Sequence, residues 1–428
     1  MITKLLLKQV IEDQSEQVSL PKLVPRKKLD DIIASHKSKQ ITILTGIRRC
    51  GKSIILQEIR KMCAPANYYI NFDDERLMQF GVSDFQMLME VFLELFGPED
   101  VLYFDEIQNI SSWERFVRRL YDQGKKVYIT GSNANLLSNE FGTHLTGRHI
   151  PFTIFPFSFS EYCDQLGIDT QKSPHSTATK VRMIQTVKSY LKEGGFPYYL
   201  QTKEKDYLRL LYDDILYRDI IVRYQLPNHK PMRELSQFVA SNIGKEMSFS
   251  QLKNMLGLSS PTTVKEYFNY LEKAYLIFIL NQYSPSLKKQ AYMSKKAYFI
   301  DLAMANLVGF RPLDDDSGYL ENIVFIALKR RELDIFFHKG KKECDFLIRS
   351  GRKITNAIQV SLSLDKPSTK EREMNGLIDA METYNLPTGT IITLEEESNE
   401  GNIDIIPVWK FLKDPEIGES DLKIEFLS

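Results

Sequence analysis

The chain has 428 residues, of which 43% are hydrophobic and 26% charged, as in soluble globular proteins. Its formal net charge is +0 at pH 7, which excludes a uniformly basic nucleic-acid-binding or membrane-surface protein, so any basic surface must be local. A chain of this length is expected to form roughly two to four domains.

The cysteines, histidines and apolar stretches argue against a zinc protein, a disulfide-linked protein and a membrane protein. The four cysteines are scattered without a C-x-x-C pair, so neither a zinc site nor a disulfide framework is expected. The six histidines show no H-E-x-x-H pattern and no paired zinc spacing. The first residues lack the pattern of a signal peptide, and no stretch approaches the roughly 20 apolar residues that cross a bilayer. We therefore expect a cytoplasmic protein that does not associate with a membrane.

A short strand followed by a helix surrounds the first functional motif. After an arm and a first helix over residues 1–35, residues 41–45 (ITILT) predict a buried strand, and apolar residues recur at helical spacing beyond residue 53. The intervening GIRRCGKS fits G-x-x-x-x-G-K-[ST], the phosphate-binding P-loop. Such a loop holds phosphate through backbone N–H groups and the helix N-terminus, whereas a glycine turn with a surface lysine is the plainer alternative. The predicted phosphate-binding residues are Gly46, Ile47, Arg48, Arg49, Cys50, Gly51, Lys52, Ser53 and Ile54.

Two acidic residues end the third predicted strand. Residues 67–72 predict a second strand, and residues 101–104 (VLYF) predict a central parallel strand that runs into Asp105 and Glu106. Ligands of open α/β sheets bind at this carboxyl edge. Because Mg²⁺ prefers oxygen ligands, Ser53 and Asp105 are the predicted metal ligands, directly or through water. Glu106 is then predicted to orient or deprotonate the attacking water, although an acidic turn after a strand is common on its own.

Polar residues follow the next predicted strand, over 125–130. Ser132 and Asn133 either sense the γ-phosphate and position the water, or serve as turn residues that cap the next helix. Arg148 is a candidate arginine finger, because a guanidinium group can neutralise transition-state charge on a γ-phosphate. A surface arginine after a glycine turn is the alternative. Whether Arg148 would act on its own nucleotide or on that of a neighbouring subunit stays open.

Several segments resemble prokaryotic AAA-type ATPases, and specifically the archaeal-type ATPase family: ITILTGIRRCGKS, YFDEIQNISSWERFVRRLYD, YITGSNANLLS, LTGRHIPFTIFPFSFSEY and GGFPYYL. The specific motifs fall in the first 200 residues, and looser ones follow. The resemblance implies that ATP binds at Lys52 and Ser53 and that Asp105 and Glu106 are the Walker B acids. It also implies a C-terminal portion that resembles a restriction endonuclease.

The middle of the chain is predicted to be helical over 166–232 and to form a winged helix-turn-helix over 234–299. Residues 245–296 contain eight lysines against three glutamates, and no arginine, so strong guanine readout is not expected. DNA binding and packing against protein are both open for this module. The residues that begin its predicted recognition helix are Thr262, Thr263 and Lys265.

The order of elements after residue 301 resembles the PD-(D/E)XK nuclease core. A helix carries Glu321, a strand carries Asp345, and a further strand follows at residues 357–361. The last motif position reads Gln359-Val360-Ser361 where the nuclease pattern has E-x-K. The domain is therefore expected to be inactive, unless a lysine from elsewhere, such as Lys366, replaces the missing one.

The sequence thus predicts an α/β protein: a P-loop NTPase with a parallel sheet, a helical lid, a winged helix-turn-helix and an α/β PD-(D/E)XK-like domain. The function predicted is an Mg²⁺-dependent ATPase that couples ATP binding and hydrolysis to conformational change, with DNA as a candidate substrate. The alternative is a nucleotide-responsive DNA- or protein-binding module with little turnover. A protein partner and a homo-oligomer are both open. The predicted domains are 1–165 (ATPase), 166–233 (lid), 234–300 (winged helix) and 301–428 (nuclease-like, inactive).

Overall fold

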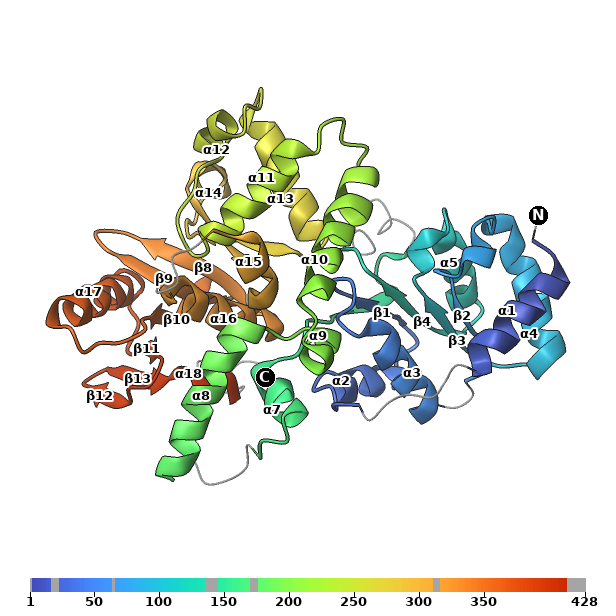
Figure 1. The fold of residues 1–428 in the computed structure, drawn as a ribbon, viewed down its shortest axis with the longest axis horizontal. Coiled ribbons are helices and arrows are strands. Elements are labelled where there is room, and N and C mark those ends of the chain that lie inside the picture. The colour runs from blue at the N-terminus through green and yellow to red at the C-terminus, as the bar shows by residue number, and fades with distance from the viewer. Residues whose placement is uncertain are drawn as a thin grey trace. The chain divides into compact units, whose positions relative to one another are not determined.

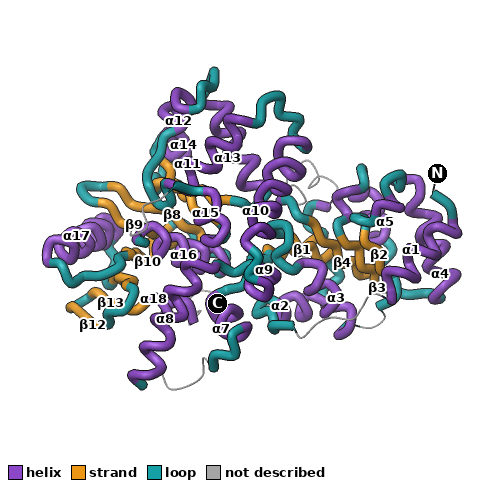
Figure 2. The backbone as a smooth tube through the Cα atoms, viewed as in Figure 1, coloured by secondary structure: helices purple, strands orange, loops and turns teal. Residues whose placement is uncertain are grey.

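The computed structural model describes residues 2–16, 23–63, 66–134, 145–169, 176–310 and 316–413. The chain divides into two compact units (Figures 1 and 2). The first unit comprises Met1–Phe155 and Lys273–Tyr275, and the second comprises Pro156–Glu272 and Leu276–Ser428. Within the described residues, no helix is both long enough and apolar enough to span a membrane. The finer division at residues 165, 233 and 300 stays a prediction.

A five-stranded parallel sheet in the order β2-β3-β4-β1-β5 forms the centre of the first unit. The four strands predicted from the sequence are present. The fifth, β5, was not predicted; it contains Pro151, which lacks a backbone donor and is tolerated because β5 is an edge strand. The strands are β1 (Ile41–Thr45), β2 (Tyr69–Asn71), β3 (Val101–Asp105), β4 (Lys126–Gly131) and β5 (His149–Thr153).

Helices cover both faces of this sheet. α1, α4 and α5 share one hydrophobic core with the strands, to which Leu7, Phe92 and Val117 contribute. α3 contacts β3 and β4, with Ile55 and Ile59 fully buried. Part of the expected N-terminal arm is therefore helix α1, whose apolar face packs against α4. The helices are α1 (Lys4–Glu16), α2 (Leu29–Ala34), α3 (Lys52–Met62), α4 (Phe85–Phe96) and α5 (Trp113–Asp122).

An eight-stranded mixed sheet in the order β12-β13-β11-β10-β9-β8-β6-β7 organises the second unit. The strands are β6 (Ile277–Gln282), β7 (Lys295–Phe299), β8 (Asp334–Lys339), β9 (Glu343–Ser350), β10 (Lys353–Val360), β11 (Gly389–Thr393), β12 (Ser398–Glu400) and β13 (Ile403–Pro407). α17 packs on β9, β10 and β11 through a core that includes Leu377 and Ala380. α16 stacks Phe325 on Tyr298 of β7, with ring centroids 4.1 Å apart.

The remaining helices of the second unit form a helical layer. α15 contacts α8, α10 and α11, and α18 contacts α7 and α8. Residues Ile215–Val222 continue α10 as a π-helix. The helices are α7 (Phe159–Gln165), α8 (Thr177–Glu193), α9 (Pro197–Thr202), α10 (Lys205–Asp214), α11 (Lys230–Ser241), α12 (Phe249–Met255), α13 (Pro261–Lys273), α14 (Leu287–Tyr292), α15 (Leu302–Val308), α16 (Ser317–Arg330), α17 (Pro367–Tyr384) and α18 (Val408–Lys413).

The elements expected of a winged helix occur in the predicted order: α11, α12, α13 and the antiparallel pair β6 and β7. The pair is also the edge of the C-terminal sheet, because β6 runs parallel to β8 with Asn281 opposite Phe336. The hairpin that was expected as a free wing therefore continues the sheet that carries Asp345. A period-2 apolar pattern predicts a strand but does not reveal which neighbour the strand pairs with.

Candidate nucleotide-binding site

The P-loop has backbone conformations that favour glycine. Gly46 and Gly51 have φ angles of 141° and 103°, in the region open mainly to glycine. A Cβ atom on Gly46 would lie 2.0 Å from the carbonyl oxygen of Ile154, so a side chain cannot be placed there without moving the backbone. The first intrahelical hydrogen bond of α3 runs from Ile55 N to Gly51 O (3.0 Å), which leaves the N–H groups of the first turn directed out of the helix N-terminus. This loop and helix end together form an anion-binding arrangement.

Two side chains at the start of α3 lie beside this loop. Lys52 is only 4% exposed, and its Nζ donates to the carbonyl oxygens of Gly46 (3.1 Å) and Ile47 (3.0 Å). Ser53 Oγ donates to Asp105 Oδ1 over 3.1 Å. The serine of the P-loop and the acid of β3 are therefore in direct contact, although they are 52 residues apart in the sequence.

Asp105 is fully buried at the carboxyl edge of β3. Its carboxylate accepts hydrogen bonds from the hydroxyl groups of Ser53, Thr130 and, at 3.4 Å, Tyr69. Burial, together with the charge of Glu106, raises the pKa of Asp105 to about 6. A carboxylate surrounded by hydroxyl oxygens is a donor set that fits a hard divalent cation such as Mg²⁺.

Glu106 follows on a left-handed turn, with φ at 51° and ψ at 39°. Its N–H donates to Thr130 Oγ1 (2.9 Å), and its Oε2 accepts from Gln108 Nε2 (2.5 Å). Thr130 therefore contacts both acidic residues, one through its hydroxyl proton and the other through its oxygen. The turn gives Glu106 a direction different from that of Asp105, and its side chain is only half-buried.

Ser132 and Asn133 lie directly beyond β4, which pairs with β1 so that Gly131 is opposite Thr45. They are 2% and 1% exposed. Among the described residues, Ser132 Oγ has no hydrogen-bond partner. A buried hydroxyl without a partner costs on the order of 1–3 kcal/mol, and Ser132 follows the strand that pairs with β1, which leads into the P-loop. The helix that these residues were expected to cap lies outside the described residues.

The structure does not bring Arg148 to this site. Arg148 precedes β5 at the amino edge of the sheet, where its carbonyl oxygen accepts from Ile41 N (2.8 Å). Its guanidinium lies 3.9 Å from Asp122 Oδ1 and over the ring of Tyr121. The length of β1, roughly 13 Å, separates this edge from the P-loop. An arginine finger in cis is therefore excluded by strand direction, and only a role toward a neighbouring copy stays a prediction.

Three residues that the sequence reading missed contact the site. Thr130 bridges both acids. Arg26 donates to the carbonyl oxygens of Cys50 (2.9 Å) and Phe155 (2.7 Å), and so ties the P-loop to the segment after β5. Tyr275 Oη donates to Thr45 Oγ1 (2.8 Å) at the end of β1. Thr130 could have been suspected as the last polar residue of its strand, but no sequence signal links Arg26 or Tyr275 to the loop.

The two carboxylates expected of a nuclease centre, Glu321 and Asp345, lie together in the second unit, each 3.0 Å from Lys296 Nζ. Asp345 N donates to Gln359 Oε1 (3.2 Å), so the glutamine is placed as the resemblance implies. Lys366, proposed as a replacement for the missing lysine, is exposed before α17. Among the described residues, no group of three or more His, Cys, Asp or Glu side chains is arranged to hold a metal ion.

Comparisons with known proteins bear on both units. A family model described as "AAA domain" matches residues 38–163, which contain the P-loop, both acids and the polar end of β4. A second model, described as "Domain of unknown function (DUF8612)", matches residues 184–314. Among curated proteins, the uncharacterized protein MJ1544 of Methanocaldococcus jannaschii is 32% identical over 432 residues, covering 95% of this chain and 95% of its own length.

The chain belongs to the same family as MJ1544. An uncharacterized protein of Haemophilus influenzae is also similar, at 28% identity over 83% of this chain and 90% of its own length. Residues 38–163, which make up most of the first unit, match the AAA domain, so this unit contains the P-loop domain that the sequence predicted. The comparisons do not support the expected restriction-endonuclease-like domain, because the model that reaches into the second unit describes a domain of unknown function.

Solved structures show weaker similarity to this chain. The ORC1 protein of Aeropyrum pernix, solved in complex with DNA, is 12% identical with a TM-score of 0.31, covering 70% of this chain and 95% of that chain. A STAND protein of Pyrococcus horikoshii is 16% identical with a TM-score of 0.28, covering 72% of this chain and 46% of that chain. These scores are low, and nothing about function follows from them.

The buried charge of Asp105 predicts an unusual stability effect. We expect Asp105→Asn to raise the free energy of unfolding at pH 7, measured without nucleotide or metal, by about 1–3 kcal/mol. Because the pKa of Asp105 is raised to about 6 in the fold, stability should fall as pH rises from about 4 to 6, and the variant should lose this dependence. Denaturant titrations across this pH range, with the exposed Asp30→Asn as control, measure the effect. A less stable Asp105→Asn would contradict it.

Proposed function

We propose that the chain is an Mg²⁺-dependent ATPase of the AAA type, in which ATP binding and hydrolysis change the conformation of the second unit. One observation carries this proposal: Ser53 Oγ of the P-loop lies 3.1 Å from Asp105 Oδ1 of β3. Thr130 hydrogen-bonds both the Asp105 carboxylate and the backbone N–H of Glu106. A glycine turn with a surface lysine does not require a fully buried acid from another strand. A nucleotide site does, because phosphate and metal must be bound side by side.

Each residue has a role that follows from its place. Backbone N–H groups of residues 46–54 bind the phosphates, and Lys52 exchanges its two carbonyl contacts for the β- and γ-phosphates. Ser53 and Asp105 would hold Mg²⁺, which neutralises phosphate charge when bound.

Glu106, turned away from Asp105 and less buried, orients or deprotonates the attacking water. Ser132, whose hydroxyl has no partner among the described residues, donates to the γ-phosphate or the water; Asn133, equally buried, lies beside it.

The segment Lys273–Tyr275 supplies a candidate link between nucleotide and the second unit. It belongs to the first unit but continues α13 and leads into β6. Tyr275 is 5% exposed and has a φ of 58°, a conformation that an aromatic residue adopts only when its surroundings hold it. Its hydroxyl bonds Thr45, which directly precedes Gly46. A shift of the P-loop on binding ATP would therefore be felt at the end of α13.

A nucleotide-responsive DNA-binding module is the second candidate. α13 exposes Thr262 and Lys265, and α14 exposes Lys288 and Lys289, as a surface for phosphate contacts requires. The basic excess is smaller than the sequence suggested, because Lys295 and Lys296 are buried.

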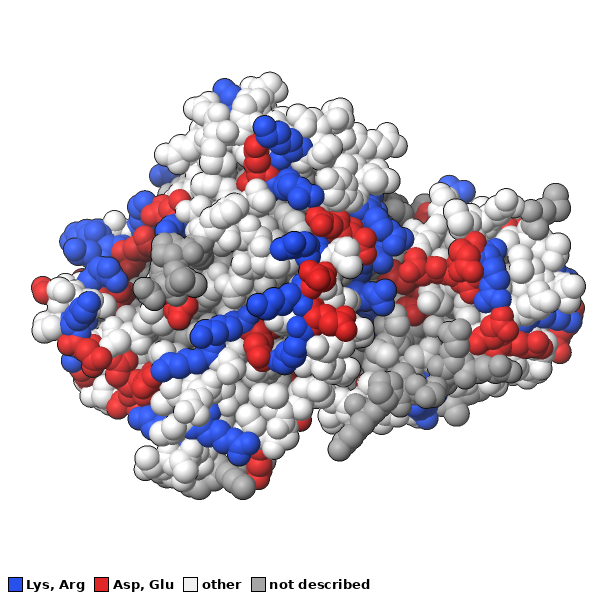
Figure 3. Space-filling view, in the orientation of Figure 1, with Lys and Arg blue, Asp and Glu red and all other residues white. Residues whose placement is uncertain are grey.

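On the face in Figure 3, basic and acidic side chains are interspersed, in keeping with zero net charge. DNA, a protein partner and a homo-oligomer in which Arg148 acts on a neighbouring copy all stay predictions.

The primary test is ATP turnover by the full chain. We expect Lys52→Ala to abolish nucleotide binding or hydrolysis, and Glu106→Gln to retain bound ATP while phosphate release falls about 10²-fold or more. Lys61→Ala, an exposed lysine at the other end of α3, is the matched control and should keep wild-type turnover. Unchanged phosphate release in both site variants would refute the mechanism. Release that is absent in wild type, with and without duplex DNA, would favour the binding module.

A second test isolates the buried hydroxyl at the end of β4. Ser132→Ala should lower phosphate release about 10–100-fold and leave nucleotide affinity nearly unchanged, because the donor acts on developing charge. Its folding stability should not fall, since no intramolecular hydrogen bond among the described residues is lost.

The matched control for Ser132→Ala is Ser35→Ala. This buried serine donates to Ile32 O (2.6 Å), so its loss should reduce stability and leave turnover intact. Wild-type turnover in Ser132→Ala would show that the residue only shapes the turn.

A third test examines the link through Tyr275. Tyr275→Phe removes one hydroxyl and keeps the ring, so basal hydrolysis should stay within about twofold of wild type. Hydrogen exchange of residues 249–273, compared with and without ATP in a Glu106→Gln background, should lose most of its nucleotide-dependent change. Tyr270→Phe, a residue of α13 whose ring stacks on Tyr224, is the control. An undiminished exchange difference in Tyr275→Phe would rule out this link.

A further inference from the structure

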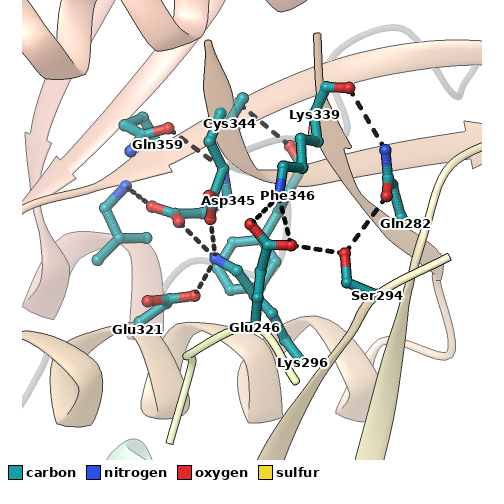
Figure 4. A network of polar contacts seen from close by, with 12 residues as sticks. Glu246, Gln282, Ser294, Lys296, Glu321, Lys339, Cys344, Asp345, Phe346 and Gln359 are labelled. Atoms are coloured by element: carbon teal, nitrogen blue, oxygen red, sulfur yellow. Dashed lines mark hydrogen bonds and ion pairs between the residues drawn. The ribbon is translucent and has the colours of Figure 1, made fainter. Parts of the chain in front are cut away.

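A buried lysine lies among three carboxylates in the second unit (Figure 4). Lys296, on β7, is 1% exposed. Its Nζ lies 3.0 Å from Glu321 Oε1 on α16, 2.8 Å from Glu343 Oε1 and 3.0 Å from Asp345 Oδ1, the last two on β9. Three elements thus converge on one ammonium group, which lies deep between the sheet and α16.

The lysine hydrogen-bonds two carboxylates and lies close to a third. Its ammonium group, which has three N–H donors and no acceptor, donates to Glu321 Oε1 and Asp345 Oδ1, and Glu343 Oε1 lies 2.8 Å away as an ion-pair partner. It is also a compact point charge, unlike the planar guanidinium of arginine. Lys296 is therefore placed as a cation at the centre of an oxygen cluster, and not as a side chain that lines a surface.

Two of the three carboxylates, those of Asp345 and Glu321, are held by contacts that do not involve the lysine. Asp345 Oδ2 accepts from the backbone N–H of Val360 (3.0 Å), and Glu321 Oε1 accepts from Tyr298 Oη (2.6 Å). Gly244 passes so close that a Cβ atom there would lie 2.7 Å from Glu321 Oε2. The oxygen cluster is consequently built by the fold of the second unit, and the lysine occupies its centre.

Converging carboxylate oxygens are the ligands that hard divalent cations require. We propose that Lys296 is the resident cation of this centre: its ammonium takes the place of a divalent metal ion, and the carboxylates bind such an ion only when the lysine is removed. With the lysine in place, no group of three or more His, Cys, Asp or Glu side chains among the described residues is arranged to hold a metal ion.

The charges around Lys296 explain why the centre is suited to either cation. Burial, reinforced by the charge of Asp345, raises the pKa of Glu321 to about 7. Burial alone would lower the pKa of Lys296, but the carboxylates, with Glu321 and Asp345 foremost, raise it well above its ordinary value. The lysine therefore stays charged and is not a general base at neutral pH. Removing it leaves buried carboxylates that need a new cation.

The test is Mn²⁺ binding to the full chain without nucleotide, measured by electron paramagnetic resonance. Lys296→Met should bind one additional Mn²⁺, about tenfold or more tighter than wild type at this centre, and Lys296→Met/Asp345→Asn should lose it. Comparing these two variants cancels any Mn²⁺ bound at Asp105. Thermal unfolding of Lys296→Met should occur at a lower temperature in EDTA and recover in Mn²⁺.

Lys339→Met is the matched control, because Lys339 pairs with Glu246 in the adjoining network and is exposed. It should gain no Mn²⁺ site. Wild-type protein that binds Mn²⁺ and loses it on Asp345→Asn, or that cuts DNA with Mn²⁺ only while Asp345 is intact, would overturn the proposal. So would a Lys296→Met variant that gains no Mn²⁺, or that stays unfolded in EDTA and Mn²⁺ alike.

Discussion

The buried carboxylate of Asp105 sets the strongest constraint on the first unit. An ionised acid without exposure to water is costly, and burial raises its pKa to about 6. Its hydroxyl partners come from α3 and β4, so the P-loop and the end of β4 must both be in place. The parallel sheet order, with β4 between β1 and β3, satisfies this requirement. The loop can take this position because residue 46 is a glycine, since a side chain there would collide with the backbone of Ile154.

The two units treat buried negative charge in opposite ways. In the first unit, hydroxyl groups surround Asp105, which leaves the acid suited to a metal ion that comes with a nucleotide. In the second unit, the chain supplies its own cation, and Lys296 joins β7, α16 and β9. The hydroxyl groups around Asp105 are suited to a site that binds and releases a metal ion. Lys296 and its carboxylates fix the hairpin of β6 and β7, which follows α13, to the sheet.

Motifs of adjacent residues were readable from the sequence because their chemistry is local. The P-loop lies at a strand-to-helix turn, and Asp105 and Glu106 end a buried strand, as predicted. The AAA domain inferred from them is confirmed by the family match over residues 38–163. Arg148 illustrates the limit of such reasoning. The residue type fits an arginine finger, but the direction of β5 places it at the amino edge of the sheet.

The sequence by itself determined the strand-to-helix turn of the P-loop, the acidic strand end and four of the five strands around them, since each depends on residues within one turn or strand. Only the tertiary structure decided that β4 separates β1 from β3, that Thr130 bridges the two acids, and that Tyr275 reaches Thr45. It also decided that Lys296 lies among three carboxylates rather than on a basic surface. Such contacts join residues far apart in the chain, and strand order and side-chain burial, which a local pattern does not encode, bring them together.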